Sequence, residues 1–175
     1  LIINGAHSPA FDVIMKLFSA VKIWFPLYGI IALWLSNPNW QSRDSLAYSA
    51  KERGVKFWKI ALTAIVIVAG TYIISENIAS LFKDNIQRFR PSHDPIIGEL
   101  VRTIDGKGSL YGFFSAHAAN CFGFALISSL IIKNRIYTPI IIVWSLIIAY
   151  SRMYLGMHYP LDILCGLICG GVIAT

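Results

Sequence analysis

Two histidines and one carboxylate stand out in an otherwise apolar sequence. His158 and Asp162 are four residues apart, a spacing that places both side chains on one side of a turn into a helix. The carboxylate can then hydrogen-bond one ring nitrogen, which fixes the tautomer and frees the other nitrogen for attack. His117, from a distant segment, can protonate a leaving oxygen. These residues predict catalysis with His158 as the nucleophile.

Three cations accompany these groups, namely Lys83, Arg90 and Arg152. Two guanidinium groups and one ammonium group match the oxygens of a phosphate group. Ser115 adds a hydroxyl group, and the helix expected after it adds free backbone N–H groups and a positive dipole end. A nucleophile, an acid and an anion cradle together predict phosphoryl transfer through a phosphohistidine.

A metal site is the competing interpretation, because two histidines and a carboxylate are a possible ligand set. Phosphatases that use metals need several carboxylates, however, and only Asp162 lies among these residues. The three neighbouring cations would also repel a metal ion. The residues therefore favour a mechanism with no metal and no cofactor. The cysteines lie in apolar stretches without a CxxC pair, and they predict neither a disulfide nor a metal site.

The composition indicates a membrane protein. Hydrophobic residues make up 56% of the chain and charged residues 14%, whereas soluble domains carry about 25% charged residues. The net charge of +6 comes from basic residues at the ends of apolar runs, so nucleic-acid binding is not favoured. The length suits one domain, residues 1–175, and both ends resemble trimmed ends of a longer protein. The sequence indicates no particular protein partner.

Several apolar stretches approach the roughly 20 residues that cross a bilayer as a helix. They are residues 21–35, 57–74 with a helical continuation towards Lys83, 114–132, 137–150, and a last stretch from Pro160. They predict an all-α fold, a polytopic transmembrane helical bundle of about five or six spans. Before them, Ser8 can cap an amphipathic helix that lies in the membrane interface, with Pro9 at its first position. Alternatively, this segment simply begins the first span.

Loop charges predict the orientation. Basic residues gather in the segments 36–59 and 133–135, and the positive-inside rule places both in the cytoplasm. The connections 83–113 and 151–160 then share the outer face, where all the candidate site residues fall at span ends. We therefore expect an integral protein of a bacterial inner membrane, with its site on the periplasmic face.

Three segments resemble signatures of the type-2 phosphatidic acid phosphatase superfamily. They are Lys83-(six residues)-Arg90-Pro91, Phe114-Ser115-Ala116-His117 and Ser151-Arg152-(five residues)-His158-(three residues)-Asp162. The second signature is normally Pro-Ser-Gly-His, so Phe114 replaces a proline and Ala116 a glycine. Because alanine still permits helical geometry, we expect catalysis to survive with an altered pocket shape.

The resemblance implies a metal-independent phosphatase that acts on a lipid phosphate, such as undecaprenyl diphosphate, lipid A or a phosphoglycerolipid. It implies that phosphate is held by Lys83, Arg90, Ser115 and Arg152. It further implies that His117 protonates the leaving group, while His158 with Asp162 forms and hydrolyses a phosphoenzyme. The alternatives are a phosphotransferase that moves phosphate between lipids and a non-catalytic anion-binding membrane protein.

Three further charged residues lie near the candidate site residues in the sequence pattern. Glu76 lies within the second span, where it can pair with a cation of the site or contact a head group, although a structural role is favoured. Arg88 and Lys107 lie in the outer connection, where both are candidates to bind an anionic substrate.

Overall fold

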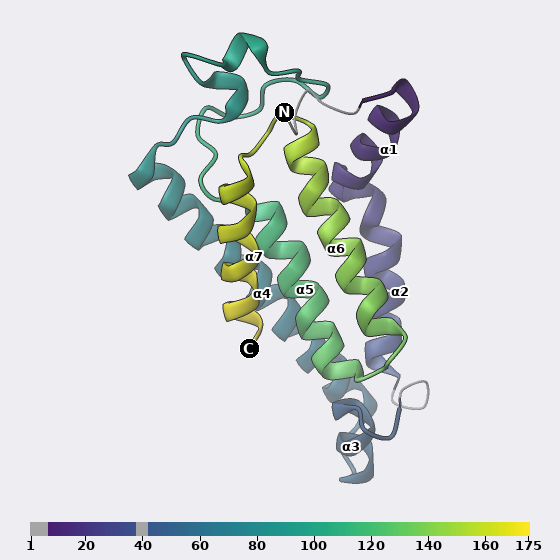
Figure 1. Ribbon diagram of the computed structural model, residues 1–175. Coiled ribbons are helices and arrows are strands. Elements are labelled where there is room, and N and C mark those ends of the chain that lie inside the picture. Colours follow the sequence, from purple (N-terminus) through teal and green to yellow (C-terminus); the bar gives the residue numbers. More distant parts are fainter. Residues whose placement is uncertain (1–6, 38–41) are drawn as a thin grey trace.

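The computed structural model describes residues 7–37 and 42–175, and the regular elements in this part of the chain are all helical. Residues 1–6 and 38–41 of the predicted domain lie outside the described residues. The α-helices are α1 (Pro9–Ser19), α2 (Phe25–Ser36), α3 (Leu46–Glu52), α4 (Phe57–Ile86), α5 (Ala116–Ile132), α6 (Tyr137–Tyr154) and α7 (Pro160–Ala174). Figure 1 shows α2 and α4 to α7 arranged lengthwise as a bundle, with α3 at one end and the connection 87–115 at the other. The prediction of an all-α fold is confirmed.

Helix α1 begins as the sequence predicts. The Ser8 hydroxyl accepts a hydrogen bond from the N–H of Phe11 at 3.2 Å, and Pro9 occupies the first turn, where its missing N–H is not needed. The axis of α1 is bent by 68° from the helical segment Val21–Trp34 that follows. The segment is therefore a separate helix joined to the first predicted span by a sharp bend.

Helix length supports fewer spans than the sequence pattern does. Only Trp58–Ile86 within α4 is long and apolar enough to cross a membrane alone, among the residues that were searched. The bent pair of α1 and the segment after it would count as a second span. Helices α5 and α7, with 17 and 15 residues, are shorter than the roughly 20 residues of a typical span. The count of five or six spans therefore remains a prediction.

Close packing of α5 on α7 fixes the start of both helices. Gly166 and Gly170, four residues apart on α7, face the carbonyl oxygens of Ser115 and Ala119. A Cβ atom at either glycine would overlap these oxygens, so only glycine permits this approach. The contact brings the first turn of α5 against the second and third turns of α7.

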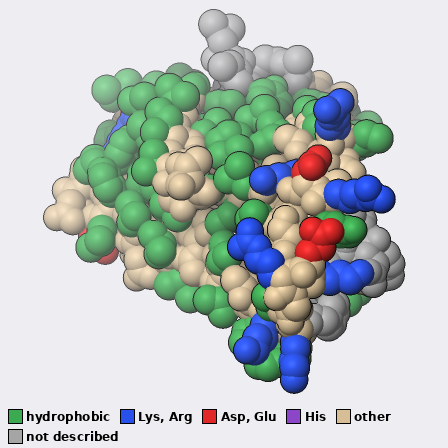
Figure 2. Space-filling view, turned by 90° about the horizontal axis from the view of Figure 1, so that it is seen from below, with side chains coloured by type: hydrophobic (Ala, Val, Ile, Leu, Met, Phe, Trp, Pro, Cys, Tyr) green, Lys and Arg blue, Asp and Glu red, His purple; other side chains and the backbone are tan. Residues whose placement is uncertain are grey.

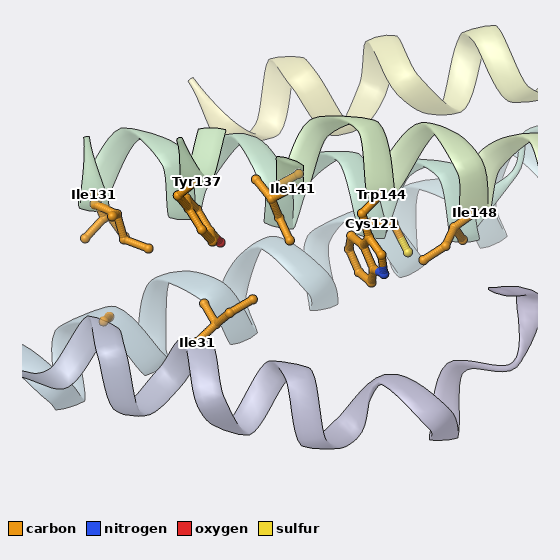
Figure 3. Packing of buried hydrophobic residues seen from close by; sticks show 10 residues of the cluster. Ile31, Cys121, Ile131, Tyr137, Ile141, Trp144 and Ile148 are labelled. Carbon is orange, nitrogen blue, oxygen red and sulfur yellow. The ribbon is translucent and has the colours of Figure 1, made fainter. Parts of the chain in front are cut away.

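The apolar core lies between α2, α5 and α6. Figure 3 shows Ile31 of α2 directed towards a buried row on α5 and α6 that includes Cys121, Ile141, Trp144 and Ile148. In a bilayer, where the alternative neighbour of an apolar side chain is lipid, close van der Waals packing of this kind holds the helices together. The core thus holds α6 in register with α5.

The end of the bundle that carries α3 is basic. Figure 2 views the molecule from this end and shows Lys and Arg side chains gathered over part of it. Only two acidic residues, Asp44 and Glu52, occur in the segments 36–59 and 133–136. The basic residues of these segments are Arg43, Lys51, Arg53, Lys56, Lys59, Lys133 and Arg135.

Candidate active site

The chain direction alternates between consecutive helices, so the ends of α4 and α6 meet the starts of α5 and α7. This junction lies opposite α3 (Figure 1) and includes every residue of the predicted site. Lys83 lies in the last turn of α4 and Arg152 in that of α6, while Arg90 lies in the connection after α4. The start of α5 carries Ser115 and His117, and the start of α7 carries His158 and Asp162. The positive dipole ends of two helices therefore point towards the candidate site.

The ring of His158 is buried, with 2% of its surface exposed, and its Nε2 atom lies 3.2 Å from Nη1 of Arg90. A guanidinium group can only donate, so this contact requires a lone pair on Nε2 and places the ring proton on Nδ1. Burial lowers the pKa of His158 to about 4, and the charges of Arg90 and Arg152 add to this effect against the opposing influence of Asp162. At neutral pH the ring is therefore uncharged, as a nucleophile requires.

Arg90 itself is held by neutral acceptors. Its Nη1 donates to the carbonyl oxygen of Met157 at 3.0 Å, and its Nη2 donates to the Ser109 hydroxyl at 2.9 Å. Burial lowers the pKa of Arg90. The guanidinium group is fixed beside the imidazole without a carboxylate to neutralise it.

Asp162 is fully buried and does not make the hydrogen bond to His158 that the sequence predicts. Its Oδ2 lies 3.7 Å from Nδ1 of His158, which is too long for a hydrogen bond, and accepts one from the N–H of Tyr159 at 2.9 Å instead. Its Oδ1 accepts from Nη1 of Arg88 at 2.9 Å. The physical reason is position: Asp162 is the third residue of α7, where a carboxylate caps free N–H groups.

Arg88, which the sequence analysis named as a candidate to bind an anionic substrate, instead pairs with the carboxylate of Asp162. Besides bonding Asp162, its guanidinium carbon lies 4.4 Å from the ring centre of Tyr159, and the Tyr159 hydroxyl donates to Asp94 at 2.8 Å. Arg88 thus contacts the carboxylate of the candidate site rather than open solvent. One feature of the sequence agrees with this position: Arg88 and Arg90 are two residues apart. Because Phe89 between them is extended and pairs with Tyr111, the two arginine side chains lie on the same side of this short segment.

Arg152 is connected to α1. Its Nη1 donates a hydrogen bond to the Ser19 hydroxyl, and its Nε is buried without a hydrogen-bond partner among the residues described. The polar side of α1 is therefore turned towards the protein, whereas Val13, Ile14 and Leu17 are exposed. Sequence analysis did not identify Ser19 as a neighbour of the site.

Two further ion pairs hold the polar side of α1. Nη1 of Arg102 donates to Asp12 at 2.9 Å, and Lys16 lies 3.2 Å from Asp105. The Tyr154 hydroxyl also donates to Asp12. Helix α1 is thus fastened to the end of α6 and to the connection that carries Arg90.

The second signature forms the cap of α5. The fully buried Ser115 accepts a hydrogen bond at its hydroxyl oxygen from the N–H of Ala118, at 3.4 Å, and its own N–H donates to the carbonyl oxygen of Asp162 at 3.1 Å. Phe114 is buried against Phe82, with ring centres 5.4 Å apart. The replacement of proline by phenylalanine is therefore accommodated by packing against α4. His117, in the first turn, lines a cavity that continues between α2 and α4.

The donors of the site do not form a metal centre. Among the described residues, no three His, Cys, Asp or Glu side chains come together in a way that could hold a metal ion. Both carboxylate oxygens of Asp162 already accept hydrogen bonds. The arrangement instead combines a neutral imidazole with guanidinium groups, which suits an anionic group at Nε2.

The comparisons with known proteins agree with this chemistry. Residues 55–175 match the family model described as the PAP2 superfamily. The chain is 34% identical over 174 residues to a lipid A 4'-phosphatase of Bacteroides thetaiotaomicron, covering 98% of this chain and 70% of that protein. It is 30% identical over 181 residues to a lipid A 4'-phosphatase of Porphyromonas gingivalis, covering 99% and 67%.

A solved structure shares the fold. The transmembrane PAP2-type phosphatidylglycerolphosphate phosphatase of Bacillus subtilis superimposes with a TM-score of 0.65 at 18% identity, covering 99% of this chain and 77% of that one. The helical arrangement is therefore the one found in a phosphatase that is embedded in a membrane.

Proposed function

This chain belongs to the PAP2 superfamily and is a membrane lipid phosphatase, and we propose that it hydrolyses a phosphate monoester on the sugar head group of lipid A and releases inorganic phosphate. The contact between Arg90 and Nε2 of His158 carries this proposal, because it directs a neutral ring nitrogen into a cationic pocket. The two lipid A 4'-phosphatases support the choice of lipid, since both align with nearly the whole chain.

The proposed reaction has two steps. In the first, Nε2 of His158 attacks phosphorus, the bond to the sugar oxygen breaks, and His117 donates a proton to that oxygen. In the second, His117 accepts a proton from water, whose oxygen attacks the phosphohistidine and releases inorganic phosphate. Asp162 supports the charged ring between the two steps.

The proposed anion cradle consists of side chains and backbone. Arg90, Arg152 and Lys83 neutralise the phosphate oxygens, and the starts of α5 and α7 direct their dipoles at it. Ser115 contributes through its hydroxyl proton, since its oxygen already accepts a hydrogen bond from the backbone.

We also propose that the helices form five or six spans with this site at the periplasmic face of a bacterial inner membrane. The excess of basic residues at the α3 end supports this orientation, because the positive-inside rule places that end in the cytoplasm. The exposed apolar residues along α4, such as Leu62, Val66 and Ile73, support contact with lipid.

The test is a phosphate-release panel with the purified chain in detergent. Lipid A, undecaprenyl diphosphate and phosphatidylglycerol phosphate are the substrates, and mass spectrometry identifies which phosphate of lipid A is lost. We expect the highest kcat/KM on lipid A, with loss of one phosphate. Faster hydrolysis of undecaprenyl diphosphate would contradict the proposed substrate. A phosphorylated lipid acceptor without free phosphate would establish phosphotransfer instead.

A further inference from the structure

A cavity of about 640 Å³ extends from His117 between α2, α4 and α5. Along α4 its lining runs from Ala64 to Glu76, a length of about 18 Å at 1.5 Å per residue. This is more than half of the roughly 30 Å hydrocarbon core of a bilayer. The lining is mostly apolar, so the cavity suits a hydrocarbon chain.

The cavity is open on its outer side. Its lining residues Ile65, Tyr72 and Ile73 are 57%, 55% and 57% exposed. Because these residues lie on the long helix that qualifies as a membrane span, the opening faces the region of lipid. A lipid chain can therefore enter sideways, without passing through water.

One polar pair interrupts the apolar lining. Glu76 of α4 accepts a hydrogen bond at Oε1 from the side-chain amide of Asn120 on α5, at 2.6 Å. Lys83, seven residues further along α4, interacts with the charge of Glu76, but no described residue donates a hydrogen bond to the second carboxylate oxygen. The Oδ1 atom of Asn120 is buried and also has no hydrogen-bond partner among the described residues. A carboxylate oxygen in an apolar setting is unfavourable unless a donor reaches it. A lipid in the cavity can supply a donor to these oxygens.

We propose that the cavity holds a hydrocarbon chain of the substrate, and that Glu76, oriented by Asn120, accepts a hydrogen bond from an amide N–H or hydroxyl group near its phosphorylated end. This inference rests on the proposed function, because it assigns the cavity to the lipid whose phosphate is removed. The pair selects lipids with a donor at this position over lipids that carry only ester groups.

The position of the pair determines how close that donor lies to the reacting group. Asn120 follows His117 by three residues, about 4.5 Å along the axis of α5. His117 is the proposed acid at the leaving oxygen. The donor group therefore lies within a few bonds of the ester oxygen that carries the phosphate, and the chain beyond it extends towards Ala64.

Two commercial lipids test this selection. Ceramide 1-phosphate carries an amide N–H and a hydroxyl group close to its phosphate, whereas dioleoyl phosphatidic acid has only ester groups there. We expect the purified chain in mixed micelles to favour ceramide 1-phosphate in kcat/KM by on the order of tenfold, as for one hydrogen bond to a charged group. In Glu76→Gln, an amide N–H group faces the donor, so this preference should fall towards one.

The ratio of the two rates is measured in one preparation, so a lower folded fraction does not change it. Asn77→Ala is the matched control, because Asn77 is exposed beside Glu76 and bonds only its own helix at Ile73. We expect it to keep the wild-type preference within about twofold. Equal rates on the two lipids, or an unchanged ratio in Glu76→Gln, would overturn the inference alone. Phosphate release from none of these lipids, lipid A included, would overturn the proposed function as well.

Discussion

Replacing Arg88 with alanine removes the cation that holds the carboxylate of the candidate site. Asp162 is fully buried, and Arg88 bonds its Oδ1 at 2.9 Å while 35% of the arginine side chain stays exposed. Removing one partner of a fully buried pair costs about 3–5 kcal/mol, and solvent access to this arginine reduces the expected loss to about 2 kcal/mol. For a chain of this size that loss lowers the melting temperature by about 4–8 °C.

The same substitution changes the pH dependence of the reaction. In the wild type, the pKa of His158 is about 4, and the ring must be neutral to attack. Loss of Arg88 leaves the negative charge of Asp162 uncompensated near Nδ1, which favours the protonated ring and raises the pKa of His158. The acid limb of kcat/KM therefore moves to higher pH, since a larger fraction of the ring is protonated at any acidic pH.

The measurement is thermal unfolding in detergent together with phosphate release from lipid A between pH 3.5 and about 8, a range chosen to include the ordinary histidine pKa. Lys107→Ala is the control, because Lys107 is an exposed cation of the same connection. Its backbone carbonyl oxygen accepts a hydrogen bond from the Ser92 hydroxyl, and this bond does not depend on the lysine side chain. We expect it to leave both quantities unchanged. An Arg88→Ala variant with the wild-type melting temperature and acid limb would refute the role assigned to this ion pair.

Four further substitutions or treatments have defined outcomes. His158→Ala abolishes phosphate release and acid-labile labelling of the protein, and retained activity would exclude His158 as the nucleophile. His117→Ala lowers kcat/KM for the lipid by about 10²–10⁴-fold but lowers kcat/KM for p-nitrophenyl phosphate much less, because kcat/KM reports the first step and that leaving group needs no proton; equal losses in kcat/KM would argue against an acid role. A chelator leaves the rate unchanged, whereas a loss restored by added metal would reverse the choice of mechanism. Gly170→Ala forces a methyl group onto the carbonyl oxygen of Ala119 and lowers the melting temperature. Gly171→Ala is the control, because its Cβ would meet a ring carbon of Phe122 at 3.6 Å, an ordinary van der Waals contact. Equal melting temperatures of the two variants would contradict the close packing of α5 on α7.

The sequence predicts the helices well because apolar runs and caps are local signals. The run expected from residue 57 towards Lys83 is α4, and the run that starts at Pro160 is α7. The fourth run was expected to end at Tyr150, yet α6 continues to Tyr154, where the N–H of Leu155 donates to the carbonyl oxygen of Ser151 and the Ser151 hydroxyl donates to that of Ile148. Apolar content alone cannot show that a polar turn at a helix end stays helical.

The contacts of the site are harder to predict, because they depend on an irregular connection. Span order places His158 and Arg90 at one end of the bundle, but the fold of residues 87–115 decides which atoms meet. The pairing of Arg88 with Asp162, and the position of Ser19 beside Arg152, arise from that connection and from the bend after α1. Apart from the two-residue spacing of Arg88 and Arg90, neither contact has a periodic signal in the sequence.

The electrostatic design of the site favours an anionic substrate. Arg90 and Arg152 are bonded by neutral oxygens, and in the described part of the chain no carboxylate lies within ion-pair distance of either guanidinium group. Asp162, the carboxylate between the two helix starts, is already paired with Arg88. Two largely buried positive charges without a counter-ion are unfavourable until an anion arrives. A phosphate group supplies that anion beside Nε2 of His158, so binding of the substrate completes the charge balance and brings phosphorus to the nucleophile at the same time.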